Sequence, residues 1–434
     1  MSPTAIGLVG MAALLVLLFL RMPIGIAMSL VGALGIAALN SPDAALIALG
    51  SYPYSYSAVH SLSVIPLFVL MGNFAVVSGM SSDLFAAAYA WVGHRRGGLA
   101  SATILGSAGF AALSGSSVAS AITMGRVALP EMRHYKYDDR LATGTVAAGG
   151  TLGILIPPST ILVVYAILTE QSIGRLFLAG FLPGLLLTAL FVVTIMLVTR
   201  FRPHFGPPGK MMSFAERIAA LRRAGALIAV VVVTIGGIYA GVFTVTEAAA
   251  VGAGLTLAHA IWRRRLTRAT LSDALLQTVR TTAMVFLILI GAHIFSPFLA
   301  ITRIPTELAG SMMSLGLPPL GVLAIILAAY IVLGMFLEGF AMMVLTIPIV
   351  FPILTGLGYD PIWFGIIMVI VLEMGLISPP VGINVFVVKG VAEDVPMSKI
   401  FVGILPFWVA MLVCVVLLIV FPEVALVLPN TMSR

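Results

Sequence analysis

The sequence predicts an all-α polytopic membrane protein, built as an inverted repeat with two re-entrant helical hairpins and two broken transmembrane helices. Of its 434 residues, 61% are hydrophobic and 9% are charged, and the mean hydropathy is +1.16. A soluble domain carries about 25% charged residues, and no water-facing globule buries this much apolar side chain. Apolar runs long enough to cross a bilayer follow one another along the whole chain. Two Pro-Pro pairs interrupt matching positions in two similar halves.

Ten apolar stretches approach the length of about 20 residues that a transmembrane helix needs. Two others, 101–132 and 324–354, are interrupted in the middle by polar or small residues. No basic residue precedes the first apolar run and no cleavage site follows it, so we expect it to be retained as a span. The short amphipathic segment 266–279 is expected to lie along the membrane interface. The expected spans are 4–20, 23–40, 61–80, 141–169, 173–199, 224–243, 246–262, 281–300, 361–388 and 400–421.

Basic residues predict the orientation of the chain, because Lys and Arg collect in cytoplasmic loops. Both flanks of the stretch 101–132, at 93–96 and 133–136, are basic and are therefore expected on the cytoplasmic side. A stretch that begins and ends on one side is a re-entrant hairpin. Its Ser/Gly-rich centre, 113–120, suits a position inside protein or beside water rather than against lipid. The stretch 324–354 has flanks poor in Lys and Arg and is expected to enter from the opposite side.

The two halves of the chain align at a shift of 222 positions. Pro157-Pro158 then falls on Pro379-Pro380, and Gly153 falls on Gly375. Two related halves of opposite orientation are typical of secondary transporters, which bind substrate at the repeat interface. The predicted organisation has a first repeat (1–200) with scaffold helices, hairpin 101–132 and broken span 141–169. A cytoplasmic linker (201–223) leads to a second repeat (224–434) with scaffold helices, hairpin 324–354 and broken span 361–388.

The hairpin tips and broken spans are the predicted binding sites. A Pro-Pro pair removes two backbone donors and frees carbonyl groups near the membrane midplane, where an unpaired carbonyl is costly. A sodium ion accepts carbonyl and hydroxyl oxygens, and helix N-termini suit a substrate carboxylate. The candidate sodium ligands are Ser114, Gly115, Ser116, Ser117, Gly153, Pro157, Gly334, Gly375, Ser378, Pro379 and Gly382. The candidate substrate ligands are Ser117, Ser159, Thr160, Glu338, Gly339 and Asn384.

A few titratable residues lie within the apolar runs, where such groups are functional candidates. Glu338 and Glu373 belong to the second half, at the hairpin tip and in the broken span. Glu247 is either functional or the capping residue of a helix start. His293 is more typical of a packed or hydrogen-bonded histidine. Cys414 is the single cysteine, which excludes a disulfide framework and a thiolate metal cluster.

Four segments resemble the large membrane (DctM-like) subunit of the tripartite ATP-independent periplasmic (TRAP) transporters: 113–120, 153–159, 244–250 and 377–384. The resemblance covers essentially the whole chain. One departure is Val245, where the family usually has proline between two threonines.

The resemblance implies an elevator transporter like those of the ion-transporter superfamily, in which hairpins and broken spans move together against a scaffold. It implies symport driven by a sodium gradient, with Na+ as coupling ion and no organic cofactor, in the bacterial inner membrane. The implied partners are a small four-helix membrane subunit (DctQ-like), a periplasmic substrate-binding protein (DctP-like) and a small organic acid. Selectivity in this family belongs largely to the binding protein.

Other classes fit less well. A free-standing sodium-coupled carboxylate transporter of the same superfamily would share the hairpins and remains an alternative; a channel would need a filter motif that the sequence lacks. No zinc-protease motif, nucleotide-binding loop or matched catalytic partners appear, so we do not expect an enzyme. No basic stripe carries interleaved aromatic residues, so nucleic acid is not an expected partner.

Overall fold

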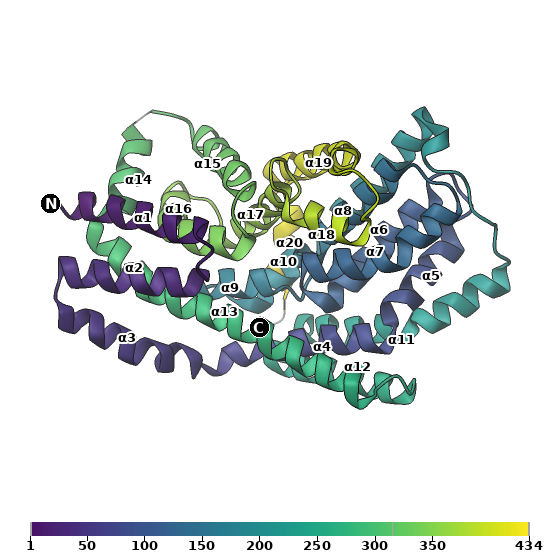
Figure 1. Cartoon of the computed structure of the whole chain (residues 1–434), viewed down its shortest axis with the longest axis horizontal. Coiled ribbons are helices and arrows are strands. Elements are labelled where there is room, and N and C mark those ends of the chain that lie inside the picture. The colour runs from purple at the N-terminus through teal and green to yellow at the C-terminus, as the bar shows by residue number, and fades with distance from the viewer. Residues whose placement is uncertain (1, 315, 433–434) are drawn as a thin grey trace.

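The computed structural model describes residues 2–314 and 316–432, and its regular elements in these ranges are all helices (Figure 1). Six of these helices are long and apolar enough to cross a membrane, or seven if one bent pair is a single span. The prediction of an all-α polytopic protein is therefore confirmed. In chain order the helices are α1 (Pro3–Phe19), α2 (Ile24–Leu39), α3 (Pro42–Ser57), η1 (His60–Ser63), α4 (Val64–Ser78), α5 (Met80–Val92), α6 (Gly98–Ser114), α7 (Ser117–His134), α8 (Asp139–Leu155), α9 (Thr160–Leu168), α10 (Ile173–Phe201), η2 (Pro203–Phe205), α11 (Phe214–Tyr239), α12 (Val245–Trp262), α13 (Arg268–Thr302), α14 (Ile304–Ser314), α15 (Pro319–Gly334), α16 (Gly339–Gly356), α17 (Pro361–Leu376), α18 (Ile383–Val391), α19 (Met397–Val420) and α20 (Glu423–Thr431).

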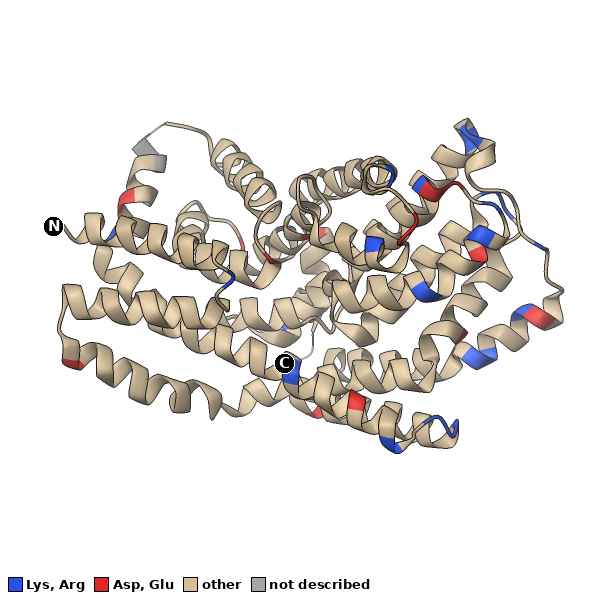
Figure 2. Cartoon of the chain, viewed as in Figure 1, with Lys and Arg blue, Asp and Glu red and all other residues tan. Residues whose placement is uncertain are grey.

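Charged residues are sparse along the helices, and many of them lie in loops and near helix ends (Figure 2). Many of the Lys and Arg residues lie toward the right-hand end in that view, which includes the basic loops that the sequence predicts to be cytoplasmic. The long uncharged stretches are the surfaces that lipid can cover at least cost.

Helices α1, α2 and α3 pack with the long helix α13 (Figure 1). Glycines allow the backbones of α2 and α13 to approach closely. A Cβ atom on Gly25 would lie 2.1 Å from the Leu287 carbonyl oxygen, and one on Gly291 would lie 2.4 Å from the Gly25 carbonyl oxygen. Small residues at such crossings are typical of membrane helix pairs, because they maximise van der Waals contact.

The structure corrects the prediction for segment 266–279. This segment is not a separate interfacial helix, because α13 runs without interruption from Arg268 to Thr302. Thr267 and Thr270 form a reciprocal cap at its start, and no glycine or proline separates the two predicted parts. The helix therefore begins in the polar segment and continues into the predicted span.

Other helix boundaries also differ from the predicted ones. Helices α3, α14 and α20 lie outside the predicted spans, and α5 shares only Met80 with one of them. Helix α11 begins at Phe214, within the segment predicted as the linker 201–223. Ser213 and Glu216 form the capping box that starts it, a signal that a hydropathy search does not detect.

The predicted interruptions coincide with helix ends. Helices α6 and α7 meet at Gly115 and Ser116, and helices α15 and α16 meet at 335–338. Helices α8 and α9 are bent by 42° across their break. Helices α17 and α18 separate at 377–382, and the Pro157-Pro158 and Pro379-Pro380 peptide bonds are cis. The opposite membrane orientation of the two halves stays a prediction.

Elements from both halves of the chain pack into one unit. Helix α8 packs against α19, and α7 packs against α18. Glycines bring α8 and α19 together, since a Cβ on Gly403 would lie 2.0 Å from the Arg140 carbonyl oxygen. Arg133 on α7 forms an ion pair with Asp394, which follows α18. The Tyr165 hydroxyl on α9 donates to the Pro361 carbonyl oxygen at 2.6 Å. These links hold the breaks of both halves around one cavity.

Candidate functional site

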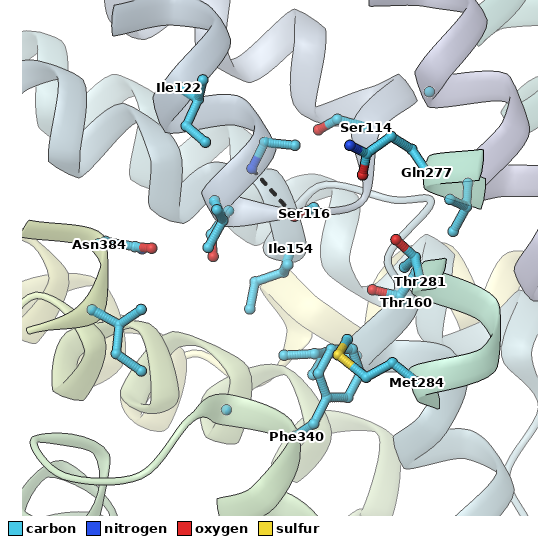
Figure 3. A pocket seen from close by; sticks show the side chains of 18 of the residues that line it. Ser114, Ser116, Ile122, Ile154, Thr160, Gln277, Thr281, Met284, Phe340 and Asn384 are labelled. Atoms are coloured by element: carbon cyan, nitrogen blue, oxygen red, sulfur yellow. Dashed lines mark hydrogen bonds between the residues drawn. The ribbon is translucent and has the colours of Figure 1, made fainter. Parts of the chain in front are cut away.

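Four helix N-termini meet at a cavity of about 420 Å³ (Figure 3). They belong to α7 and α9 from the first half and to α16 and α18 from the second. Each N-terminus carries unpaired backbone N–H groups and a partial positive charge. Four such ends around one space form an environment that suits an anion. The residues of these N-termini that line the cavity include Ser116, Ser117, Thr160, Gly339, Ile383 and Asn384.

Side chains cap three of these N-termini. The Ser116 hydroxyl accepts from the Ala119 backbone N–H at 3.3 Å, and the Ser159 hydroxyl accepts from the Leu162 N–H at 3.3 Å. The Glu338 carboxylate accepts from a backbone N–H of α16 at 3.4 Å. A single cap accepts a hydrogen bond from only one of the unpaired backbone N–H groups in the first turn, so others remain for a ligand.

The first hairpin tip packs directly onto the first broken span. Gly115 has a φ of +59°, and a Cβ there would also lie 2.8 Å from the Pro158 carbonyl oxygen. A Cβ on Gly153 would lie 2.5 Å from the Ser116 carbonyl oxygen. The Thr160 hydroxyl donates to the Gly115 carbonyl oxygen at 3.0 Å. The predicted residues of this half therefore lie together, with backbone oxygens close to hydroxyl groups.

The second hairpin and the second break are joined in a similar way. Gly334 and Gly375 face each other, and a Cβ on Gly375 would lie 2.6 Å from the Gly334 Cα. The Ser378 hydroxyl donates to the Met374 carbonyl oxygen at 2.6 Å and accepts from Trp408 Nε1 at 3.0 Å. The Ser378 side chain is thus already held by two hydrogen bonds.

The predicted site residues divide into two groups by position. Seven of them line the cavity: Ser114, Ser116, Ser117, Thr160, Glu338, Gly339 and Asn384. The others are absent from the lining and form the hairpin tips and breaks around it: Gly115, Gly153, Pro157, Ser159, Gly334, Gly375, Ser378, Pro379 and Gly382.

The opposite wall of the cavity comes from α4 and α13, which the sequence did not assign to the site. Gln277, Thr281 and Met284 lie along one face of α13 and line the cavity, as does Asn73 of α4. Figure 3 shows Gln277, Thr281 and Met284 across the cavity from Asn384. The polar residues at 277 and 281 are one helical turn apart, a spacing that signals a shared face.

Glu373 was noted in the sequence as an intramembrane carboxyl group but was not placed in the site. It is 1% exposed, and Asn384 is fully buried. Asn384 Nδ2 donates to Glu373 Oε2 at 3.0 Å. In the described part of the chain, Glu373 Oε1 and Asn384 Oδ1 have no hydrogen-bond partner.

Two other titratable residues have structural roles. Glu247 accepts from the Thr244 backbone N–H at 2.8 Å, and the Thr244 hydroxyl caps the helix in return, so Glu247 forms a capping box. The His293 ring stacks on the Tyr56 ring with 3.5 Å between the ring centroids.

No Lys, Arg or His is found among the described residues that line the cavity. An anionic ligand in this cavity would therefore meet backbone N–H groups, amides and hydroxyls rather than a fixed positive side chain. The cavity has the chemistry of a binding and transport site.

These features define a membrane transport protein whose site lies between broken helices. The family model "Tripartite ATP-independent periplasmic transporter, DctM component" matches residues 11–424. The chain belongs to this family and is a TRAP transporter large permease subunit.

Three relatives match this chain over most of its length. The chain is 40% identical over 406 residues to the C4-dicarboxylate large permease DctM of Pseudomonas aeruginosa, covering 93% of each chain. It is 34% identical over 419 residues to the sialic acid large permease SiaM of Vibrio cholerae, covering 95% of this chain and 96% of SiaM. It is 34% identical over 391 residues to the isethionate permease DctMQ of Oleidesulfovibrio alaskensis, covering 87% of this chain and 61% of DctMQ.

The fold also resembles a solved transporter structure. The YdaH transporter of Alcanivorax borkumensis superposes with a TM-score of 0.61 at 14% sequence identity, covering 89% of this chain and 88% of YdaH. This likeness concerns the fold alone.

Proposed function

We propose that this subunit carries a small organic acid across the bacterial inner membrane together with sodium ions. The observation that supports this most directly is the cavity at which four helix N-termini meet. The N–H groups suit the carboxylate of the substrate. The three characterised relatives named above transport C4-dicarboxylates, sialic acid and isethionate, all of which are organic anions.

Sodium ions would occupy the two pairs of hairpin tip and helix break. Hairpin and broken span touch at Gly115 and Gly153 in the first half, and at Gly334 and Gly375 in the second. Carbonyl oxygens at interrupted helices are typical sodium ligands in transporters, so the residues present fit this ion. The bound ion supplies the positive charge that lets the anion enter without a basic side chain.

Transport would follow an elevator motion. Helices α7, α9, α16 and α18 would move as one block, while α4 and α13 supply the opposite wall and stay in the scaffold. The ion pair of Arg133 with Asp394 and the close packing of α8 on α19 support a block that includes parts of both halves. A small membrane subunit would hold the scaffold, and a periplasmic binding protein would deliver the substrate.

The test is uptake of labelled organic acids into proteoliposomes that contain this chain and its small subunit. We expect uptake to require both an inward sodium gradient and the binding protein. Uptake by this chain alone would assign it to the free-standing sodium-coupled carriers. Flux that is independent of the gradient would favour a channel and refute the elevator mechanism.

A further inference from the structure

A buried carboxyl group next to the cavity has no ion-pair partner among the described residues. Glu373 lies on α17, every residue of which after Pro361 is buried, and it is 1% exposed. Asn384 is its hydrogen-bond donor, at 3.0 Å. The Ser117 hydroxyl lies close to the same carboxyl group, and the Glu338 carboxyl group is near enough to interact with it. None of the ion pairs among the described residues includes Glu373 or Glu338.

The polar atoms that remain around this carboxylate are oxygens. Glu373 Oε1 and Asn384 Oδ1 are both buried and both lack a partner in the described residues. Because one hydrogen bond joins the two side chains, their free oxygens share one small region of the protein. Burying an ionised carboxylate without compensation costs several kcal/mol, and a cation bound between these oxygens would offset that cost.

We propose that Glu373 and Asn384, with the Ser117 hydroxyl, hold a sodium ion at a position additional to the two pairs of hairpin tip and break. One carboxylate, one amide and one hydroxyl are hard oxygen donors with a single negative charge, which matches a monovalent cation. A transition metal is a poor fit, because no group of three His, Cys, Asp or Glu side chains in the described part of the chain forms a metal site. The inference deepens the proposed function and rests on it for the identity of the ion.

The position of this ion would couple sodium binding to substrate binding. Ser117 begins α7 in the first half, Glu373 lies on α17 and Asn384 begins α18 in the second half, so the ion joins elements of both halves. Ser117 and Asn384 also line the cavity. Without the cation, the Glu373 carboxylate repels a substrate anion placed beside Asn384. With the cation bound, that repulsion is removed, so sodium binding favours substrate binding.

The test measures thermal unfolding and equilibrium binding of radioactive sodium on the purified chain with its small subunit. Sodium is titrated against choline at constant ionic strength, without substrate. The variants are Glu373→Gln, which keeps the size and the hydrogen bond to Asn384, and Glu373→Asp, which keeps the charge. Glu423→Gln is the matched control, because Glu423 is exposed on α20.

We expect Glu373→Gln to raise the sodium concentration for half-maximal stabilisation by about tenfold or more and to bind less sodium at saturation. Glu373→Asp should retain the sodium response, and Glu423→Gln should match the wild type. If Glu373→Gln does not fold, Asn384→Asp provides the second variant, which should respond at lower sodium concentrations because it adds a charge. A wild-type response that Glu373→Gln leaves unchanged overturns this site alone. A wild type that sodium does not stabilise overturns the sodium coupling of the proposed function as well.

Discussion

Replacing Gly153 with alanine tests whether the close contact between the first hairpin and the first broken span is needed for ion binding. The new Cβ would lie 2.5 Å from the Ser116 carbonyl oxygen and 2.7 Å from Ser120 Oγ. The first of these atoms is backbone and cannot rotate away. To reach an ordinary contact, the hairpin tip must retreat from the broken span by about 1 Å.

The expected energies follow from this geometry. Overpacking of this kind costs about 1–3 kcal/mol. Alanine in place of glycine within a helix contributes about 0.5–1 kcal/mol in the opposite direction, so the net loss of folding stability is smaller. If the displaced tip weakens sodium binding by the same 1–3 kcal/mol, the half-saturating sodium concentration rises roughly 5- to 150-fold.

The assay is sodium-dependent uptake in proteoliposomes, with thermal unfolding measured on the same preparations. Gly236→Ala is the matched control, because a Cβ there meets no atom of the chain within 4 Å. We expect the control to be slightly more stable than the wild type and to transport normally. A Gly153→Ala protein with the control's stability and an unchanged half-saturating sodium concentration would show that the contact does not form the ion site.

Three further predictions concern other contacts of the same unit. Thr160→Val removes a hydrogen bond to the hairpin carbonyl and should lower stability by about 1 kcal/mol and reduce uptake, as measured by unfolding and transport. Arg133 holds the pKa of Asp394 below its usual range through a side-chain hydrogen bond. The Asp394→Asn variant should therefore unfold at a slightly lower temperature at pH 7; this difference should persist down to about pH 4 and disappear as the pH falls through the lowered pKa. A disulfide between cysteines that replace Met284 on α13 and Phe340 on α16 should stop transport reversibly, because it ties the scaffold wall to the moving block.

Each of these predictions has its own control. Thr188→Val removes a hydroxyl that donates to the Gly184 carbonyl of its own helix, so it should not affect uptake. The wild-type and Asp394→Asn proteins should unfold alike in strong acid; a difference that persists there would contradict the ion-pair explanation. The cysteine pair is placed in a protein in which Cys414 is replaced by alanine. Full transport by the crosslinked protein would refute the relative motion of the two walls.

The fold class and the position of the site follow from features that act locally in the chain. Composition identifies lipid as the solvent, and Pro157-Pro158 and Pro379-Pro380 interrupt their helices regardless of what packs around them. The glycine and serine residues at 114–117 likewise indicate a hairpin tip, because their effect on the helix is also local. The breaks therefore lie where the sequence places them.

The features that could not be predicted from the sequence depend on which helix faces pack against each other. Gln277 and Thr281 are polar residues on one face of α13, but only the folded chain shows that this face lines the cavity. Glu373 stands among apolar residues with no local sign that Asn384, eleven positions later, would turn back to meet it. The start of α13 was misassigned because polar residues can begin a spanning helix as well as lie on the interface.

The described residues that line the cavity include no basic side chain, which affects how tightly such a site can hold an anion. A guanidinium forms paired, charge-assisted bonds with a carboxylate, and such a complex dissociates slowly. Backbone N–H groups at helix ends have no side chain to mutate and hold many small anions about equally well. A permeation site made of such N–H groups favours rapid release of the bound anion over tight binding. The rate of transport then depends on this site, while selection of the substrate does not. Under the proposed mechanism, a separate binding protein would capture the substrate from dilute surroundings, and exchanging that protein would let the same permeation pathway carry a different substrate.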